Sequence, residues 1–521
     1  MRPILIDASC SGIGQQERLI PMDLGCRWMN ALSRKLMILA GAVAMASAAS
    51  AQDIVWSKHY GGVYNEGGYA FVQTPDGGYA AVGSTFSYGA GDHDVYLIRT
   101  DSLGDTLWSR TYGGPLADYG HDILIAPDSG FIMVGTTLSF GRGKEDLYLI
   151  RTNRWGDLLW SRTYGGAQTD EGWSIRATRN GGYIVCGTTA SLGKGYGDLW
   201  LLRLNAVGDS LWAKTFGGAG GESGFAVRET PDGGFIAVGC TGSFGEGYSS
   251  IYTVKVSSSG DSLWARTYGG AKADVGYAIE NTLDLGYIIA GSTASFGLGY
   301  SDAYIVKLDG FGNVEWQNTF GGIKDDRAYA VCPTIDGGYV LAGTTESFGA
   351  GGSDQYIVKV DPLGYSTWTK TFGGHQADYC RAVGVNRAGA LVLAGYTYSF
   401  SAGGSDLYVS TVSTEGATDV YEPLEANLPS GFTLDQNYPN PFNMTTRIEF
   451  TLPRRSEVTL TIYNLLGQVA RTYDRENLPA GSFSVEWDGA SEDGRPLASG
   501  IYFYRLVTTD FAASRKMVLL K

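Results

Sequence analysis

Seven tryptophans stand 52 residues apart along this chain, with no insertion or deletion between them. They are Trp56, Trp108, Trp160, Trp212, Trp264, Trp316 and Trp368. A fixed period of roughly 50 residues is the signature of an array of structural repeats, in which each unit packs against its neighbours. This tryptophan ladder constrains the fold more than any other feature of the sequence.

Each repeat contains four short apolar segments separated by turn sequences. Asp-Gly-Gly, as at 76–78, and Asp-x-x-Gly, as at 101–104, are typical of hairpins because glycine accepts a positive φ. Segments such as 183–187 are apolar on both faces, so both faces need to be covered. We therefore predict an all-β fold in which residues 52–416 form a seven-bladed β-propeller with four-stranded blades; a stacked β-solenoid is the alternative.

The order of the segments predicts how the array closes. It opens with the tryptophan segment at 54–60 and ends with an Asp-x-Tyr segment at 406–412. The first segment is then left to complete the last blade, which would join the two ends of the array by β pairing and remove exposed edges.

The first 51 residues differ from the repeats. Arg34 and Lys35 precede an apolar run at 36–46, and small residues at 49–51 provide a cleavage site, so we interpret 29–51 as a secretory signal peptide and 1–28 as a mis-annotated upstream extension. The run is shorter than the roughly 20 residues that span a bilayer, and no transmembrane segment is predicted in the mature chain. The cysteines predicted to remain after processing occupy small or apolar positions, which favours free thiols over disulfides. They are Cys186, Cys240, Cys332 and Cys380.

The formal net charge of −14, without any run of lysine or arginine, argues against a nucleic-acid partner. The four histidines occupy different positions of different repeats, so neither a metal cluster nor a catalytic triad is indicated. The Gly-x-Gly loops lack the α/β setting of a dinucleotide site. We therefore predict that the chain is not an enzyme and needs no cofactor.

An acidic residue follows each ladder tryptophan by ten positions. The set is Glu66, Asp118, Asp170, Glu222, Asp274, Asp326 and Asp378. If these carboxylates face the channel, their repulsion would raise some pKa values or recruit calcium. The alternative, which we favour, is that each accepts hydrogen bonds from the backbone of a turn.

A ligand site on a pseudo-symmetric ring is expected where the repeats differ. The differences gather on the strand after the acidic residue, which we expect to be innermost, and polar and aromatic side chains there would suit a glycan or peptide. The candidate ligand-binding residues are His121, Asp122, Trp173, Arg176, Arg228, Glu280 and Arg381. The alternative is neutral variation at a solvated channel.

After Gly416 the period ends, and 417–430 is predicted to be a linker to a second domain at 431–521. Alternating strands such as 458–462 and 502–506 predict a small Ig-like β-sandwich. The segments Asn437-Tyr-Pro-Asn-Pro-Phe-Asn443, Val458 to Gln468, Gly481 to Gly489, Gly494 to Tyr504 and Lys516 to Lys521 resemble the type A C-terminal sorting domain of the type IX secretion system, within the flagellar-hook-capping-like Ig family.

The repeats themselves are similar to short propeller repeats of secreted bacterial proteins. The sorting-domain resemblance implies Sec export, recognition by type IX secretion machinery, and release or display at the outer-membrane surface of a Gram-negative bacterium. We expect a monomeric binding or adhesion module for a glycan or protein. Two alternatives stay open: an extracellular polysaccharide-active hydrolase or lyase, because fold does not fix function, and a structural spacer without a ligand.

Overall fold

The computed structural model describes residues 47–48, 54–413 and 431–520, apart from 444, 454–455, 479–480, 493–494 and 509. The predicted linker lies outside these residues, as does most of the predicted signal peptide. The described residues form strands and turns without a helix, so no helix among them is long and apolar enough to cross a membrane. The chain divides into two compact units, and the division before Glu422 falls within the predicted linker.

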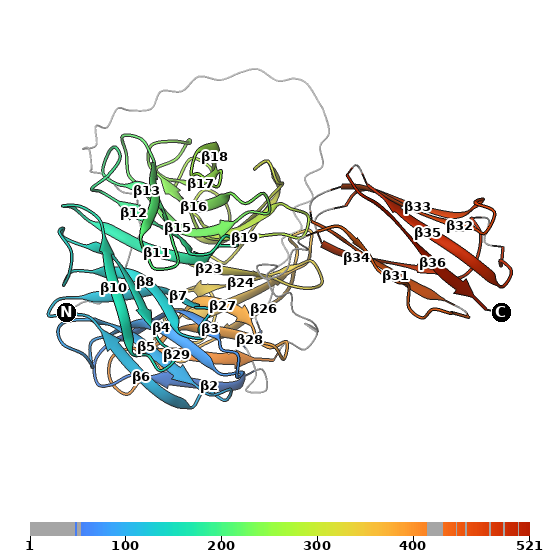
Figure 1. Ribbon diagram of the computed structural model, residues 1–521. Coiled ribbons are helices and arrows are strands. Elements are labelled where there is room, and N and C mark those ends of the chain that lie inside the picture. Colours follow the sequence, from blue (N-terminus) through green and yellow to red (C-terminus); the bar gives the residue numbers. More distant parts are fainter. Residues whose placement is uncertain are drawn as a thin grey trace, which may run out of the picture. The chain divides into compact units, whose positions relative to one another are not determined.

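The first unit is a seven-bladed propeller, as the sequence predicts, with four repeat strands in each of its seven described sheets. The innermost strands are β3 (Glu66–Gln73), β7 (Asp118–Ile125), β11 (Asp170–Ala177), β15 (Glu222–Glu229), β19 (Asp274–Asn281), β23 (Asp326–Pro333) and β27 (Asp378–Val385). Each contacts the next, and β27 contacts β3, so these strands enclose a central channel. Their labels lie near the middle of the array in Figure 1.

The remaining strands follow outwards in each blade. The second strands are β4 (Tyr79–Thr85), β8 (Phe131–Thr137), β12 (Tyr183–Thr189), β16 (Phe235–Thr241), β20 (Tyr287–Thr293), β24 (Tyr339–Thr345) and β28 (Leu391–Thr397). The third strands are β5 (Asp94–Thr100), β9 (Asp146–Thr152), β13 (Asp198–Leu204), β17 (Ser250–Val256), β21 (Asp302–Leu308), β25 (Asp354–Val360) and β29 (Asp406–Val412). The outermost strands are β2 (Ile54–Tyr60), β6 (Thr106–Tyr112), β10 (Leu158–Tyr164), β14 (Ser210–Phe216), β18 (Ser262–Tyr268), β22 (Val314–Phe320) and β26 (Ser366–Phe372).

The array closes in the predicted manner. Strand β2 pairs antiparallel with β29, with Trp56 opposite Thr411, and so supplies the outer strand of the last blade. A hydrophobic cluster that joins β4 and β5 to β28 and β29 covers the same junction. A short strand, β1 (Ser47–Ala48), pairs parallel with β26.

The second and third strands of the blades are buried along almost their whole length, which explains why they are apolar on both faces. Each hydrophobic cluster of the propeller draws side chains from two neighbouring blades; one includes Val82 and Leu97 of the first blade with Ile123 and Met133 of the second. Burying each such side chain contributes about 1.5–3 kcal/mol, so the blades stabilise one another.

The ladder tryptophans pack across blade boundaries. Six of them lie against the glycine of the turn before the outermost strand of the next blade, as Trp316 does against Gly364; this turn begins with Asp, Asn or Ser. Gly364 has a φ of 84°, and a Cβ atom there would lie 2.5 Å from a ring carbon of Trp316. The turn therefore requires glycine both for its backbone conformation and for the close approach of the indole.

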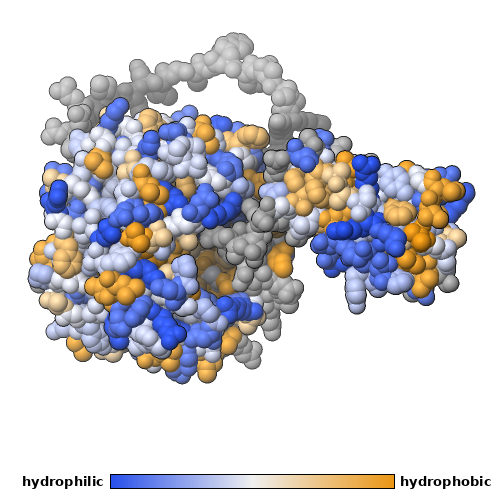
Figure 2. All heavy atoms as spheres, in the orientation of Figure 1, coloured by the Kyte–Doolittle hydropathy of each residue, from blue (hydrophilic) through white to orange (hydrophobic). Residues whose placement is uncertain are grey.

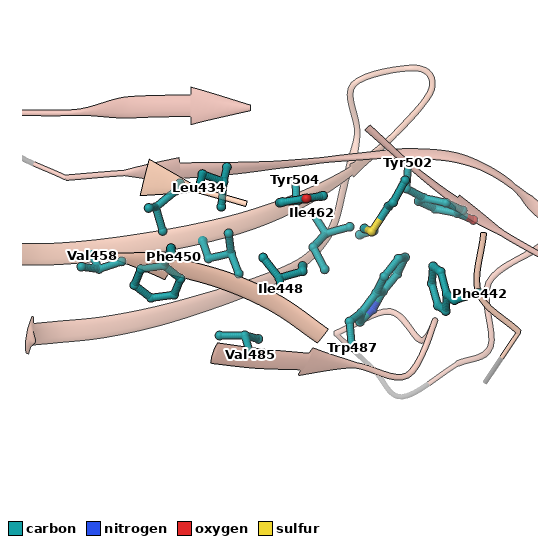
Figure 3. Packing of buried hydrophobic residues seen from close by; sticks show 14 of the residues in the cluster. Leu434, Phe442, Ile448, Phe450, Val458, Ile462, Val485, Trp487, Tyr502 and Tyr504 are labelled. Atoms are coloured by element: carbon teal, nitrogen blue, oxygen red, sulfur yellow. The ribbon is translucent and has the colours of Figure 1, made fainter. Parts of the chain in front are cut away.

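The second unit is a sandwich of two sheets. One sheet has the order β30 (Thr433–Leu434), β31 (Thr446–Leu452), β34 (Gly481–Trp487), and the other has the order β33 (Val469–Leu478), β32 (Ser456–Asn464), β35 (Gly500–Val507), β36 (Ala512–Leu519). Alternate residues of these strands point into one core, in which Trp487 contacts both Phe442 and Tyr502 (Figure 3).

All four cysteines that were expected to remain after processing are free thiols. Three of them are buried, and Cys332 is partly exposed.

Candidate functional site

The inner strand of every blade carries a β-bulge at the same position of the repeat. The register with the second strand shifts between Gly68 and Ala70 in the first blade and at the equivalent place in the other six. A bulged residue has no partner across the ladder, and its side chain is re-aimed. The seven bulged residues, here named the channel ring, are Tyr69, His121, Trp173, Phe225, Tyr277, Tyr329 and Arg381.

The channel ring is continuous because its members contact one another in blade order. Ring centroids are 5.5 Å apart for Tyr69–His121, 4.1 Å for His121–Trp173, 5.7 Å for Trp173–Phe225, 5.5 Å for Phe225–Tyr277 and 5.0 Å for Tyr277–Tyr329, and the Cζ atom of Arg381 lies 4.0 Å from the ring centroid of Tyr329. Burial raises the pKa of Tyr69, and the charge of Arg381 opposes this rise. Arg381 in the last blade therefore lies near Tyr69 in the first blade, which completes the ring. The channel is thus crossed by a layer of six aromatic side chains and one guanidinium.

His121 is the most buried member of the channel ring and is held as a neutral imidazole. Its Nδ1 lies 2.8 Å from the carbonyl oxygen of Gly172, and because a carbonyl only accepts, Nδ1 is the protonated nitrogen. Burial lowers the pKa of His121 to about 4. Trp173, stacked on this imidazole, donates its indole N–H to Glu171 at 3.1 Å.

Four of the predicted ligand-binding residues form ion pairs with one another. Asp122 accepts hydrogen bonds from Nη1 of Arg176 at 2.5 Å and from the backbone N–H of Ile175 at 2.9 Å. Arg228 donates through Nε to Glu280 at 2.6 Å and through Nη2 to the other oxygen of the same carboxylate. Each pair joins two neighbouring inner strands, so these charges already have partners within the channel wall.

Arg381 has different surroundings. Its Nη2 donates to the Tyr396 hydroxyl at 3.3 Å, and its guanidinium lies over the Tyr329 ring. The Nε atom is buried and makes no hydrogen bond with the described residues. All seven predicted ligand-binding residues therefore lie on the inner strands. Three of them belong to the channel ring, and the other four form ion pairs with one another.

Four members of the channel ring were not predicted from the sequence. Tyr69, Phe225, Tyr277 and Tyr329 agree with an aromatic preference at their repeat position, so a search for departures from the repeat passed over them. The available signal was the shared offset of 13 residues from the preceding tryptophan, which places them in register with His121, Trp173 and Arg381.

The seven acidic residues at the start of the inner strands are buried. In the third blade, Oδ2 of Asp170 accepts hydrogen bonds from the N–H of Gly166 at 2.7 Å and the hydroxyl of Ser191 at 2.5 Å. In each of the other six blades, the N–H of the glycine four residues before the acid donates an equivalent hydrogen bond to its carboxylate. These are the contacts that the turn-capping alternative predicts.

A second set of acidic residues stands at the first position of the third strands. These residues were not predicted as a site from the sequence. Its members are Asp94, Asp146, Asp198, Asp302, Asp354 and Asp406, with Ser250 at the equivalent position of the fourth blade. Burial raises the pKa of Asp354, and the charge of Asp378 in the next blade raises it further. Within the described part of the chain, no three histidine, cysteine or acidic side chains gather so as to hold a metal ion. Calcium binding at the acidic ring is the interpretation that the sequence favours less, and nothing in the described residues tests it.

Residues 440–510 match the model of the FlgD Ig-like domain family. The chain is thus a β-propeller protein with an Ig-like C-terminal domain. No curated protein matches it.

Among solved structures, PorZ, described as an essential bacterial surface component of the type IX secretion system of Porphyromonas gingivalis, is 12% identical with a TM-score of 0.39, over 88% of this chain and 59% of PorZ. The present chain thus spans less than two thirds of PorZ. The Pan2 WD40 domain of Neurospora crassa is 11% identical with a TM-score of 0.45, over 72% of this chain and 99% of that domain. A puromycin hydrolase is 14% identical with a TM-score of 0.40, over 74% of this chain and 58% of the hydrolase. The fold assignment rests on the strand pairing of the chain itself.

Proposed function

We propose that this protein is a secreted or surface-displayed binding module whose propeller recognises a ligand, without catalysis, at the channel ring. The observation that carries the proposal is the difference between two sets of repeat positions. The ladder tryptophans and turn glycines recur from blade to blade because they hold the blades together. The channel ring is instead built from five residue types at one position, at the centre of the molecule.

The chemistry of the channel ring supports recognition. Six of its seven members are partly exposed. Tyrosine, tryptophan and histidine combine a large apolar surface with a polar edge, which suits ligands that need both contact area and oriented hydrogen bonds. On the face of the propeller in view in Figure 2, hydrophobic residues lie in small separate groups among hydrophilic ones.

Binding by glycan and protein arrays, followed by calorimetry on the ligands found, tests this proposal. Trp173→Ala should weaken binding at least about 30-fold, since removal of a central aromatic contact costs about 2 kcal/mol or more. The matched control is Trp155→Ala, which removes a tryptophan that is 55% exposed outside the inner strands. The proposal fails if the folded protein binds no array ligand, or if the Trp173 variant folds and binds like the wild type.

We also propose export by Sec followed by the type IX route, directed by the C-terminal domain. The resemblance of residues 431–521 to type A sorting domains supports it, together with the FlgD Ig-like match. Deletion of 428–521 should leave the propeller in the periplasm, as measured by fractionation and immunoblotting. Unchanged secretion of the truncated chain would disprove this route.

A further inference from the structure

The inner strands carry four arginines, and the structure divides them into two kinds. Arg176 is neutralised by Asp122, and Arg228 by Glu280. Arg327 and Arg381, on the adjacent strands β23 and β27, form no ion pair with the described residues. One sector of the channel is therefore positive in a chain whose formal net charge is −14.

Arg381 is enclosed by tyrosines. Its Cζ atom lies 4.0 Å from the ring centroid of Tyr329, 5.8 Å from that of Tyr396 and 6.0 Å from that of Tyr379. A guanidinium has five N–H donors and no acceptor. Nη2 donates to the Tyr396 hydroxyl, and Nε is too deeply buried for a ligand to reach, so a ligand would meet the outer end of the guanidinium. Because Arg381 is partly exposed and has no carboxylate partner in the described structure, its charge favours an anionic acceptor.

Arg327 adds a second positive charge beside Tyr329. It precedes Tyr329 by two residues on β23, and the two side chains interact electrostatically. Asp325 and Glu346 are among the acids that act on this region: burial raises the pKa of Glu346, Asp325 raises it further, and Arg327 lowers it. Neither acid forms an ion pair with Arg327 in the described structure, so they do not neutralise the sector as Asp122 and Glu280 do for the other two arginines.

We propose that the ligand of the channel ring is a carboxylate-bearing sugar of an acidic polysaccharide, and that its carboxylate binds Arg381. This inference rests on the proposed function and specifies its ligand class. A carboxylate matches the planar fork of a guanidinium through two parallel hydrogen bonds. Tyr329 and Tyr396 contact the guanidinium and surround it with aromatic rings that carry hydroxyl groups, a combination that suits a sugar better than a peptide carboxylate.

Calorimetry on the full mature chain tests the proposal with α-1,4-tetragalacturonate and a hyaluronan tetrasaccharide. Each is compared with its neutral analogue, in which the carboxyl groups are reduced to hydroxymethyl groups. We expect at least one acidic probe to bind and its reduced analogue to bind at least about 10-fold more weakly. Arg381→Gln should weaken the acidic probe by about 30-fold or more, the usual effect of removing one partner of a buried charge pair.

Arg110→Gln is the matched control, because Arg110 also lies over an aromatic ring, with its Cζ 5.5 Å from the Trp108 centroid, but on an outermost strand. The Arg110→Gln variant should bind the acidic probe with an affinity within about twofold of wild type, because its altered cation lies away from the ligand. If the Arg381→Gln variant does not fold, Arg381→Lys retains the charge and should still lose affinity, because lysine cannot form the bidentate contact.

The outcomes separate the two proposals. Equal binding of acidic and reduced probes, with sensitivity to Trp173→Ala, overturns the carboxylate inference and leaves the binding function standing. Binding of a peptide through its C-terminal carboxylate, with no saccharide bound, overturns the sugar class. If neither the saccharides nor any array ligand binds the folded wild type, both proposals are overturned.

Discussion

The imidazole of His121 lies parallel to the indole of Trp173, with ring centroids 4.1 Å apart and planes inclined by 8°. The two side chains come from neighbouring blades and occupy the same bulged position of the repeat. The other aromatic neighbours in the channel ring meet at tilted or edge-on angles and at longer distances. This stack is therefore the tightest contact between two aromatic rings of the channel ring, and burial keeps its histidine neutral.

Lowering the pH should destabilise the propeller through His121. Its pKa is about 4 in the folded protein, against 6.5 for an ordinary histidine, so the unfolded chain binds the extra proton between these values. The stability that the folded protein gains from a neutral His121 is fully present above pH 6.5 and is lost as the pH falls towards 4. The total loss in the free energy of unfolding is roughly 3 kcal/mol. Chemical unfolding of wild type and His121→Phe as a function of pH measures this.

His121→Phe keeps an aromatic ring, as Phe225 does at the equivalent position, and removes the titrating group. The difference between the two unfolding free energies should shrink or reverse as the pH falls, while the buried acids contribute equally to both proteins. Parallel pH profiles for the two proteins would contradict the prediction.

The ion pair of Asp122 and Arg176 should be strongly coupled. Asp122→Ala leaves the guanidinium and the N–H of Ile175 without their acceptor, at a cost of roughly 3 kcal/mol. The Asp122→Ala, Arg176→Met double variant should be less destabilised than the sum of the single variants. The exposed pair of Lys58 and Asp105 is the control, with a coupling below about 1 kcal/mol. Equal coupling energies for the two pairs would contradict the prediction.

Three glycine substitutions should separate backbone strain from steric overlap. Gly364→Ala combines a positive φ with overlap against Trp316 and should cost roughly 3 kcal/mol. Gly233→Ala has a φ of 79° but open space around its Cβ position and should cost about 1 kcal/mol. Gly352→Ala has neither feature and should change stability by less than about 0.5 kcal/mol. Denaturant midpoints that do not follow this order would refute the packing role of the turn glycine.

Ser129 occupies a hairpin position that five other blades give to glycine and one gives to Leu285, and its φ is 64°. Ser129→Gly should stabilise the propeller by a few tenths to about 1 kcal/mol, since glycine adopts this conformation without a Cβ clash. Ser129→Ala should bring no such gain. Thermal unfolding of both variants checks the prediction, and a gain with alanine would point to the loss of the hydroxyl instead.

Asp354 and Asp378 should repel each other above acidic pH. The pKa of Asp354 is raised in the folded protein, so its contribution to stability is present at low pH and is lost as the pH rises through that pKa. Asp354→Asn retains the oxygen that accepts from the N–H groups of Ala350 and Gly351, and it should add about 1 kcal/mol at neutral pH.

The fourth blade allows the opposite substitution at the equivalent contact between two blades. Ser250 stands where other blades have an aspartate, so Ser250→Asp introduces a carboxylate beside Asp274 and should lower the free energy of unfolding at neutral pH. If Asp354→Asn is destabilising and Ser250→Asp is neutral, the carboxylates stabilise the junction and the prediction is wrong.

The propeller could be predicted almost completely from the sequence because its information is local and repeated. Each turn glycine and each run of apolar residues marks the same strand seven times over, so an ambiguity in one blade is resolved by the others. The closure by Ile54–Tyr60 also followed from counting segments, and the pairing of Trp56 with Thr411 confirms it. The order of the strands within a blade needed the structure.

The sequence by itself determined the period, the number of blades, the positions of the strands and the presence of a second β domain. Only the tertiary structure decided that Tyr69, His121 and Arg381 belong to one layer, because bulges re-aim the side chains and curvature brings residues about 310 positions apart together. It also decided that Arg176 and Arg228 have carboxylate partners in neighbouring blades whereas Arg381 has none in the described structure. In the sequence, a charged residue on an inner strand looks the same whether or not it has a partner. The partner belongs to another repeat, and only the closed ring brings the two residues together.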